Sequence, residues 1–402
     1  MFQCLPFAVW SGPRPTALNM APKHVTVKKR IAKTSIANEG QLATKKTICY
    51  ASDFTGLNTC GIALNKFWQQ SGSFRVRHLF GCDISRSMKR FNLFLDAPEV
   101  WYDNVVERDL TGQAKDSKSI DLYSWTSPCQ GLPQAGLQLG AKDPRTKLMF
   151  ASVAFIEKYC PKCWIMENVS TMATQARYQE FFAFIINAIT QAGPGYTVRW
   201  TVLNSNVYVP QHRPRLYMYG VRADIERVKT CGIGFWPEAV KVQPRPLSCM
   251  ISTLPPGEFK LVPDNTEGNG LGKKNVMAAI SKCAPVINPF EVPVIVDFKA
   301  SAGFSTHRIG ECPSLTKTRA GNFGYWCTSK GGPLTAEEMI QVQGFKLTDL
   351  PFREAGLSAT AIGSAIGNGQ TLPLVMDLLP HILFHANLIT VEDFRTLKQC
   401  MV

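Results

Sequence analysis

The sequence lacks several features that mark whole classes of protein. No run approaches the ~20 uninterrupted apolar residues that a membrane-spanning helix needs, so we expect no membrane partner. Its 13 cysteines are odd in number and scattered, and no secretory signal precedes them, which favours reduced thiols in an intracellular protein. No segment repeats at the spacing of solenoid proteins. We therefore expect neither a disulfide-rich secreted domain nor a stacked-repeat fold.

Motifs for metals and for common nucleotides are also missing. The only Cys-x-x-Cys, at Cys160 and Cys163, has no second pair at zinc-ligand spacing, and a loop entering a buried strand explains it better than a metal site. The sequence has neither the Gly-x-Gly-x-x-Gly of dinucleotide-binding proteins nor the Gly-Lys-Ser/Thr of phosphate-binding loops. We therefore expect no metal ion, and the pattern argues against a dehydrogenase.

Basic residues exceed acidic ones. Lys and Arg number 44 against 30 Asp and Glu, which gives a net charge of +14 and a pI of about 9.2. This excess favours a polyanionic partner such as nucleic acid, although many basic proteins bind none. Residues 1–44 have no acidic residue before Glu39, and we expect them to form a basic, poorly ordered arm. Phosphate contact, nuclear or organelle targeting and a solvated tail all remain open for this arm.

Short apolar runs alternate with helical patterns between residues 47 and 221. Several runs are apolar on both faces, as buried parallel strands are. The predicted strands are residues 47–54, 75–83, 120–127, 163–169, 198–205 and 215–221, and the predicted helices are residues 61–70, 145–159 and 177–193. This alternation predicts a doubly wound α/β sheet.

The composition shifts toward Pro and Gly after about residue 222. We expect a smaller, loop-rich domain there, with a short helix at residues 275–284. Order returns at residues 334–345, where Thr335 and Glu338 have the spacing of a capping box. The predicted organisation is an arm at residues 1–44, a sheet domain at 45–225, the smaller domain at 226–330 and a C-terminal segment at 331–402 that returns to the sheet domain.

The loops that follow the first predicted strands suit a nucleoside-like ligand. In a doubly wound sheet, ligands bind at the carboxyl ends of the strands. Gly56 follows the first strand and allows a tight turn close to a ligand. Asp83 and Asp109 end the next two candidate strands, and each acid can either accept hydrogen bonds from a ribose diol or cap a helix. Three such loops in order indicate an adenosine-type cofactor.

The later loops carry reactive or charged side chains. Cys129 lies on a turn in "SPCQGLPQAG", where its thiolate can be favoured, whereas most cysteines are small buried hydrophobes. Glu167 ends a buried strand, where a desolvated carboxyl can exchange a proton at neutral pH. Gln211, Arg213 and Arg215 alternate and so share one face of an extended segment. They can orient an anion or a planar base, but an exposed edge strand with solvated charges has the same pattern.

Five stretches together resemble one family. They are "SPCQGLPQAG", "MENVS", "QHRPRLYMYG", "PLTAEEMIQVQGF" and "AIGNGQTLP". Their order and rough spacing are those of the cytosine carbon-5 DNA methyltransferases, and the resemblance extends over about residues 47 to 385. The resemblance implies a Rossmann-like, S-adenosylmethionine-dependent methyltransferase sheet, with residues 226–330 as a small target-recognition domain.

The resemblance also implies a reaction. Cys129 would add as thiolate to carbon 6 of a flipped-out cytosine, and Glu167 would hold the base by ring nitrogen 3 and its exocyclic amine. Arg213 would hydrogen-bond the base or its surroundings, with Gln211 and Arg215 supporting that wall. Carbon 5 would then accept a methyl group from S-adenosyl-L-methionine before the carbon-5 proton leaves and Cys129 is expelled.

By the same resemblance, a second group of residues would bind the cofactor. Asp83 would contact the ribose, Asp109 would lie near the adenine amine, and Asn368 would close the methionine end. The full set is Phe54, Thr55, Gly56, Leu57, Asp83, Ile84, Asp109, Leu110 and Asn368.

Two loops depart from the family pattern. The first loop usually reads Asp-Leu-Phe-Ala-Gly-x-Gly-Gly, whereas here Ser52 stands at the acid position and Asn58 with Thr59 replaces the glycine pair. These changes bear on cofactor affinity. Pro133 replaces a common serine, which would stiffen the nucleophile loop.

The recognition segment would lie within about residues 250 to 325 and leaves little room for base readout, so we expect a short target such as a two-base context. Lys317, Arg319 and Lys330 are candidates for phosphate contacts.

Two rival functions remain. A branch of the family methylates a transfer RNA anticodon region with the same chemistry, but its typical Cys-Phe-Thr element is absent here. A catalytically silent DNA-binding member is the other rival, and the intact Cys129 and Glu167 argue against it. We expect double-stranded DNA as partner, no obligate protein partner, and a location with the DNA, which is the nucleus if the source is eukaryotic.

Overall fold

The computed structural model describes most of the chain after residue 45. The described residues are 46–108, 120–128, 144–227, 236–238, 243–255, 257–264, 270–301 and 303–400. By its internal contacts the chain divides into Met1–Leu42, which lies outside the described residues, and Ala43–Val402. The predicted arm therefore stays untested, as do the predicted boundaries at residues 225 and 330.

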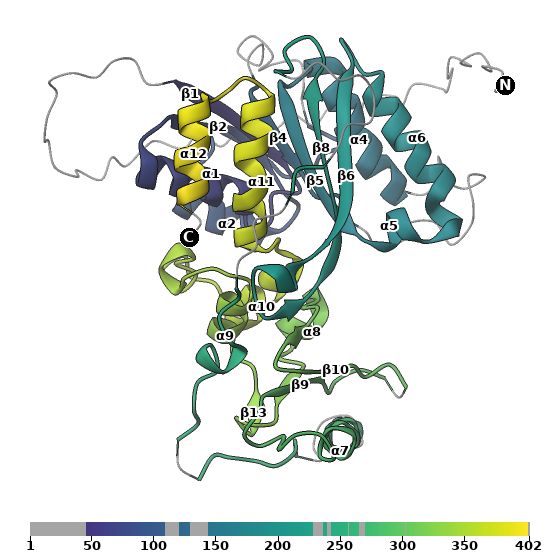
Figure 1. Ribbon diagram of the computed structural model, residues 1–402, viewed down its shortest axis with the longest axis vertical. Coiled ribbons are helices and arrows are strands. Elements are labelled where there is room, and N and C mark those ends of the chain that lie inside the picture. The colour runs from purple at the N-terminus through teal and green to yellow at the C-terminus, as the bar shows by residue number, and fades with distance from the viewer. Residues whose placement is uncertain are drawn as a thin grey trace, which may run out of the picture. The chain divides into compact units, whose positions relative to one another are not determined.

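A central sheet organises the N-terminal half of the chain (Figure 1). Its seven strands run in the order β3-β2-β1-β4-β5-β8-β6. They are β1 (Thr47–Asp53), β2 (Arg75–Cys82), β3 (Val100–Tyr102), β4 (Leu122–Trp125), β5 (Cys163–Val169), β6 (Tyr196–Asn204) and β8 (Pro214–Arg222). All of the predicted strands are present, with ends shifted by a few residues.

One strand runs against the rest. The pairs from β3 through β5 are parallel, whereas β8 is antiparallel to both β5 and β6. Only residues 205–213 separate β6 from β8, which is too short for the crossover that a parallel pair needs. The sheet is thus mostly parallel, as predicted, and β8 is inserted between β5 and β6.

Helices cover both faces of the sheet, which explains the continuous apolar strands (Figure 1). On one face, a core cluster joins β1 and β5 to α1 (Thr59–Ser71), α2 (Arg86–Leu95), α11 (Leu372–His385) and α12 (Val391–Gln399). On the other face, a second cluster joins the strands to α4 (Pro144–Tyr159), α5 (Thr171–Thr174) and α6 (Gln179–Thr190). Each predicted helix of this half is observed.

A second, antiparallel sheet lies in the Pro- and Gly-rich part of the chain. Its order is β10-β9-β12-β13, from β9 (Val294–Asp297), β10 (His307–Ile309), β12 (Tyr325–Cys327) and β13 (Gly332–Pro333). The predicted helix is observed as α7 (Leu271–Cys283), and its apolar side chains pack on β9 in a small separate core. The 3-10 helices among the described residues are η2 (Ala176–Tyr178), η3 (Ser205–Val207), η4 (Leu247–Cys249) and η5 (Leu347–Asp349).

Two contacts tie this region to the central sheet. β7 (Gln211–His212), which precedes β8, pairs in parallel with β11 (Cys312–Pro313). Further along, α8 (Lys317–Gly321) packs against α10 (Ala359–Asn368). The helix α9 (Ala336–Val342) begins with the predicted capping box of Thr335 and Glu338. Among the described helices, none is long and apolar enough to cross a membrane.

Candidate active site

The candidate site lies where the strand order reverses. β1 has β2 and β3 on one side and the later strands, beginning with β4, on the other. Asp53 is level with Cys82 of β2 and with Trp125 of β4, so the three strands end together. Crevices at such a reversal are where doubly wound sheets bind ligands. The loops that begin at Phe54, Asp83 and Thr126 therefore converge, and the Thr126 hydroxyl donates to the Phe54 carbonyl at 3.0 Å.

The first two loops fit a nucleoside. Asp83 Oδ2 accepts from the Gly56 amide at 2.9 Å, and Oδ1 accepts from the Ser85 amide at 2.8 Å. Each carboxylate oxygen keeps a lone pair for a further donor, such as a ribose hydroxyl. Burial raises the pKa of the Asp83 carboxyl above its usual value. Ile84, next to it, is 86% exposed and offers an apolar face to a ring.

The unusual first loop keeps a left-handed backbone at two residues that are not glycine, Phe54 and Asn58. Phe54, Gly56 and Asn58 all have positive φ, at 52°, 49° and 57°. Asparagine tolerates this left-handed region better than other residues with a Cβ. The Asn58 side chain turns into the protein, where its Oδ1 accepts from the Gly61 amide at 3.2 Å and the Tyr50 hydroxyl at 2.9 Å. A Cβ on Gly61 would lie 2.4 Å from the Asn58 side chain. The departure at Asn58 is thus matched by a glycine three residues later.

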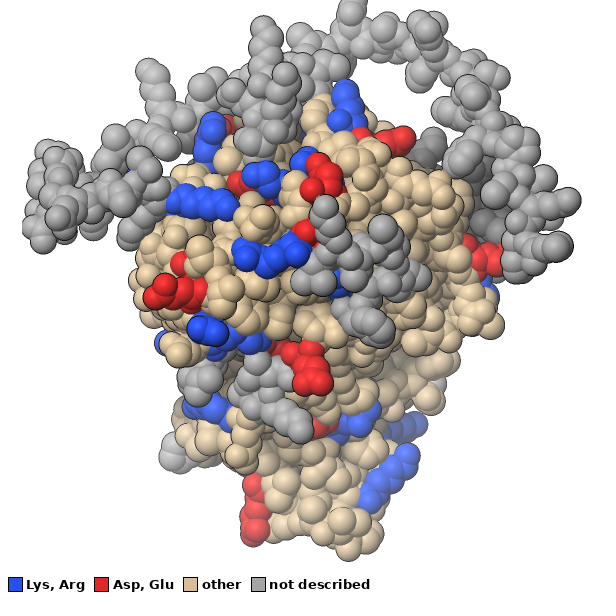
Figure 2. Space-filling view, turned by 45° about the horizontal axis from the view of Figure 1, so that its top comes forward, with Lys and Arg blue, Asp and Glu red and all other residues tan. Residues whose placement is uncertain are grey.

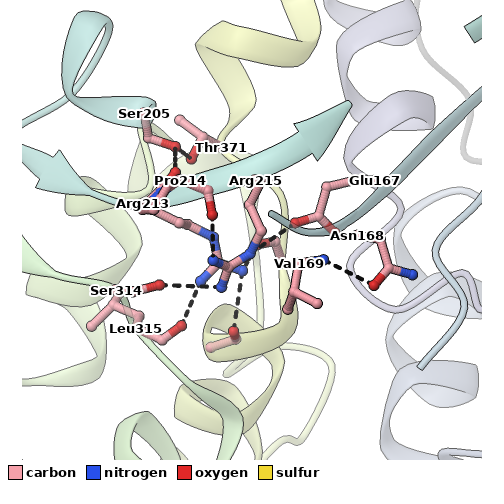
Figure 3. A network of polar contacts seen from close by, with 12 residues as sticks. Glu167, Asn168, Val169, Ser205, Arg213, Pro214, Arg215, Ser314, Leu315 and Thr371 are labelled. Carbon is pink, nitrogen blue, oxygen red and sulfur yellow. Dashed lines mark hydrogen bonds and ion pairs between the residues drawn. The ribbon is translucent and has the colours of Figure 1, made fainter. Parts of the chain in front are cut away.

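Glu167 and Arg215 form an ion pair at the end of β5 (Figure 3). Arg215 Nε lies 3.1 Å from Glu167 Oε1, and the two side chains are 14% and 9% exposed. This contact is an ion pair without the geometry of a hydrogen bond. Glu167 Oε1 therefore has no hydrogen-bond partner among the described residues. Arg215 also donates to the Ser314 hydroxyl at 3.1 Å and to the Pro214 carbonyl at 2.8 Å. The carboxyl group is therefore oriented by Arg215 and keeps an oxygen that can accept from a ligand.

Arg213, two residues earlier, is used differently. Its Nη1 donates to the Leu315 carbonyl (Figure 3), and its Nη2 donates to the carbonyls of Gly367 and Gly369. Burial, followed by the nearby charge of Arg215, lowers the pKa of the Arg213 guanidinium to about 10. Of the two arginines, Arg215 makes the ion pair with Glu167, whereas the terminal nitrogens of Arg213 are occupied by main-chain carbonyls.

Gln211 is fully buried. Its main chain pairs with Cys312 in the β7–β11 ladder. Both polar atoms of its amide lack a hydrogen-bond partner among the described residues, an arrangement that is rare in folded proteins.

Asn168 is a site residue that the sequence analysis missed. Its Nδ2 donates to the Ser127 carbonyl at 3.2 Å and to the Ser127 hydroxyl at 3.3 Å. Ser127 stands two residues before Cys129, so the residue after Glu167 anchors the start of the predicted nucleophile loop. Asn168 is part of the stretch "MENVS", which resembles the family, but no role was assigned to it from the sequence. Cys129 itself lies outside the described residues, as do Asp109, Leu110 and Pro133.

The remaining predicted residues differ in their surroundings. Asn368 is exposed at the end of α10. The prediction that Lys330 contacts phosphate is wrong, because its ammonium group is buried and donates to both carboxylate oxygens of Glu338 and to the Pro333 carbonyl. Arg319 pairs with Asp297 at 2.9 Å, while Lys317 is exposed. Within the described part of the chain, no three His, Cys, Asp or Glu side chains are grouped closely enough to hold a metal ion.

Known proteins resemble this chain in sequence. Residues 97–260 match the family model of the C-5 cytosine-specific DNA methylases. The type II methyltransferase M.NgoBI of Neisseria gonorrhoeae is 25% identical over 284 residues, which cover 69% of this chain and 80% of that protein. M.MthTI of Methanothermobacter thermautotrophicus is 35% identical over 99 residues, which cover 24% of this chain but only 29% of that protein.

Solved structures show the same fold at low identity. The S. pombe Dnmt2 methyltransferase is 13% identical, with a TM-score of 0.52 over 84% of this chain and 99% of that one. A Spodoptera frugiperda DNMT2 mutant is 16% identical, with a TM-score of 0.54 over the same shares. The class defined by the fold is therefore a methyltransferase-type α/β fold with a smaller antiparallel sheet. In sequence, the chain is similar to the C-5 cytosine-specific DNA methylases over residues 97–260.

Proposed function

We propose that this protein transfers a methyl group from S-adenosylmethionine to carbon 5 of cytosine in DNA, through a covalent cysteine adduct on a flipped-out base. The observation that carries the proposal is the Glu167–Arg215 pair, with an unsatisfied carboxylate oxygen, beside the start of the Cys129 loop. The match of residues 97–260 to the C-5 cytosine-specific DNA methylases gives this pair its chemical context.

Glu167 would bind the Watson–Crick edge of the base. One carboxyl oxygen accepts from the exocyclic amine, and the other, carrying a proton, donates to ring nitrogen 3, which gains negative charge as sulfur adds to carbon 6. Arg215 keeps this carboxylate oriented and supplies positive charge close to the base. Because Arg215 contacts Glu167 directly, we assign the base-facing role to Arg215 and a supporting role to Arg213.

Cys129 would perform the covalent step. Its thiolate forms a bond to carbon 6, and the electrons of the 5,6 double bond make carbon 5 nucleophilic. Carbon 5 takes the methyl group, loses its proton to a base, and the returning electrons expel the thiolate. The hydrogen bonds from Asn168 to Ser127 hold the chain two residues before Cys129, which supports this placement of the nucleophile.

The cofactor would bind in the crevice between β1, β2 and β4. Asp83 would hold the ribose diol, Ile84 would cover the adenine, and the loop at Gly56 would let the ligand approach its main chain. Asn368 would close the methionine end, and the proposal also includes Phe54, Thr55, Leu57, Asp109 and Leu110. When bound, S-adenosylmethionine supplies an electrophilic methyl group.

Double-stranded DNA is the proposed macromolecular substrate. The net charge of +14 favours association with a polyanion. On the face drawn in Figure 2, the described Lys and Arg side chains are interspersed with Asp and Glu. We therefore assign DNA recognition to local contacts from Lys317 and from residues 226–330. The protein would act in the compartment that contains the DNA.

A substrate comparison tests this function. The purified chain is incubated with S-adenosylmethionine carrying a labelled methyl group and with either unmethylated plasmid DNA or unmodified transfer RNA. We expect label in DNA, on cytosine carbon 5, and bisulfite sequencing then reads the sequence context. Label confined to transfer RNA would select the RNA rival. Absence of label on both substrates, from a folded chain, would support a silent DNA-binding member.

A further inference from the structure

Arg213 joins three segments that are distant in the sequence. The residue directly precedes the strand β8, and its guanidinium donates to Leu315, which precedes α8 (Figure 3), and to Gly367 and Gly369 at the end of α10. Gly367 and Gly369 are the two neighbours of Asn368. One buried side chain therefore holds both sides of the residue proposed to close the cofactor site.

Gln343 also holds the main chain around Asn368. Its Nε2 donates to the carbonyls of Ile366 and Gly369, at 3.0 and 3.2 Å, and its Oε1 accepts from the Thr371 hydroxyl at 3.1 Å. Gly369 thus accepts from both Arg213 and Gln343. The main chain on either side of Asn368 is fixed, while the Asn368 side chain is exposed and available to a ligand.

The segment that begins at Leu315 lies directly against this loop. A Cβ placed on Gly367 would come within 2.4 Å of the Thr316 carbonyl and 2.6 Å of the Lys317 amide. The end of α10 and residues 316–317 are therefore in main-chain contact, without side chains between them. Ser314, one residue before Leu315, is the partner of Arg215, which pairs with Glu167.

Movement of either segment would leave charged or polar groups unpaired. The Arg213 side chain is buried, so a carbonyl that moves away is not replaced by water, and an unpaired buried partner is costly. Residues 314–317 and 366–369 must therefore keep their relative position for the arginine to stay satisfied. A ligand that orders one segment also orders the other.

We propose that Arg213 is a positioning residue that couples cofactor binding at the Asn368 loop to DNA binding at residues 314–317. The coupling rests on the proposed function, because it takes the cofactor to bind at Asn368 and DNA to contact the region of Lys317. It adds a regulatory consequence: each ligand raises the affinity for the other, by the same factor.

The test measures that factor directly. The affinity of the chain for fluorescein-labelled duplex fragments of unmethylated plasmid is measured by anisotropy, with and without saturating S-adenosylhomocysteine. For the unmodified chain we expect S-adenosylhomocysteine to tighten DNA binding by about 5-fold or more, which is the lower end of common allosteric couplings. In R213K the factor should fall to about 1, because a lysine ammonium cannot reproduce the fork that reaches three carbonyls.

R215K is the matched control. It makes the same chemical change two residues along, on the arginine that contacts Glu167 and Ser314. We expect R215K to lower the rate of methyl transfer but to keep the coupling factor of the unmodified chain. The proposal is overturned if R213K keeps that factor and loses only catalytic rate, or if the unmodified chain binds both ligands without coupling. Failure of the unmodified chain to bind S-adenosylhomocysteine at all would instead contradict the proposed function.

A measurement on the unmodified chain covers the case in which R213K does not fold. Amide hydrogen exchange is followed with and without S-adenosylhomocysteine. Protection should appear at residues 315–317 as well as at residues 54–57 and 366–369. Protection that omits residues 315–317 would show that the recognition segment does not sense the cofactor.

Discussion

Two buried pairs of carboxylate and arginine lie near the end of the central sheet, and they have different uses. Asp53 and Arg108 have side chains 0% and 1% exposed, whereas Glu167 and Arg215 are 9% and 14% exposed. Asp53 also accepts from the hydroxyls of Tyr123 and Ser152. Glu167 Oε1 has no hydrogen-bond partner among the described residues.

The surroundings of the two arginines extend this contrast. The Arg108 guanidinium lies over the rings of Phe155 and Phe80, at 4.4 and 5.2 Å, inside the apolar core on the α4 face. Arg215 instead bridges Glu167 to Ser314, which lies in the region proposed for target recognition. An ion pair alone therefore does not mark a site. Spare acceptor capacity at a strand end distinguishes Glu167 from Asp53.

The largest expected effect comes from neutralising Glu167, the acid with spare acceptor capacity. E167Q should lower the rate of methyl transfer to plasmid DNA by about 100- to 10,000-fold, the range for loss of a positioned acid or base. Its thermal unfolding midpoint should stay close to that of the unmodified chain, because glutamine has the same shape and Arg215 keeps its hydrogen bonds to Ser314 and Pro214. A rate within about threefold of the unmodified chain would remove Glu167 from the chemistry.

Neutralising Asp53, the acid of the fully buried pair, should lower the stability of the fold. D53N leaves the buried Arg108 without its counter-charge, so urea denaturation should show a loss of about 3–5 kcal/mol in the free energy of unfolding. The double variant D53L/R108M removes both charges and should recover most of that loss. If D53N unfolds at the same urea concentration as the unmodified chain, the contrast between the two pairs fails.

The Asp83 carboxyl gives a pH-dependent effect on ligand binding. Its pKa is raised by burial, and the ionised form is the one that accepts two ribose hydroxyls. Affinity for S-adenosylhomocysteine should therefore decline as the pH falls, starting above the usual carboxyl pKa of about 4. Titration calorimetry between neutral and mildly acidic pH checks this. D83N should bind weakly with little pH dependence, and a fully retained slope in D83N would assign the effect to another group.

The smallest effect concerns the cap of α1. N58A removes the acceptor of the Gly61 amide and forces alanine into the left-handed region, so it should cost about 1 kcal/mol of stability. N58G keeps the backbone conformation and should cost only a few tenths. Urea denaturation separates the two. Equal losses in both variants would show that the left-handed conformation of Asn58 is not what alanine disturbs.

Much of the fold was predictable because it depends on local pattern. The buried strands are apolar throughout and the helices are periodic, so β1, β5 and α6 were located within a few residues. β3 was missed because it has only three residues. The antiparallel direction of β8 was not anticipated, although the short link from β6 contained the reason.

The contacts between distant residues were not predictable in the same way. Asp53 and Arg108 are 55 residues apart, and "ERDLTG" reads as a polar loop. Lys330 stands beside two glycines and suggested an exposed loop, but Glu338 of the capping box reaches it. Alternation placed Arg213 and Arg215 on one face, yet only the folded chain shows which of them pairs with Glu167.

The central claim is that Cys129 forms a covalent bond to cytosine, and trapping that bond tests it most directly. The chain is incubated with S-adenosylmethionine and DNA that contains 5-fluorocytosine, in which fluorine blocks the proton loss that releases the thiolate. Mass spectrometry under denaturing conditions should find a DNA adduct on the peptide that contains Cys129 and none in C129S. An unmodified chain without adduct, or an adduct that survives in C129S, would contradict the account.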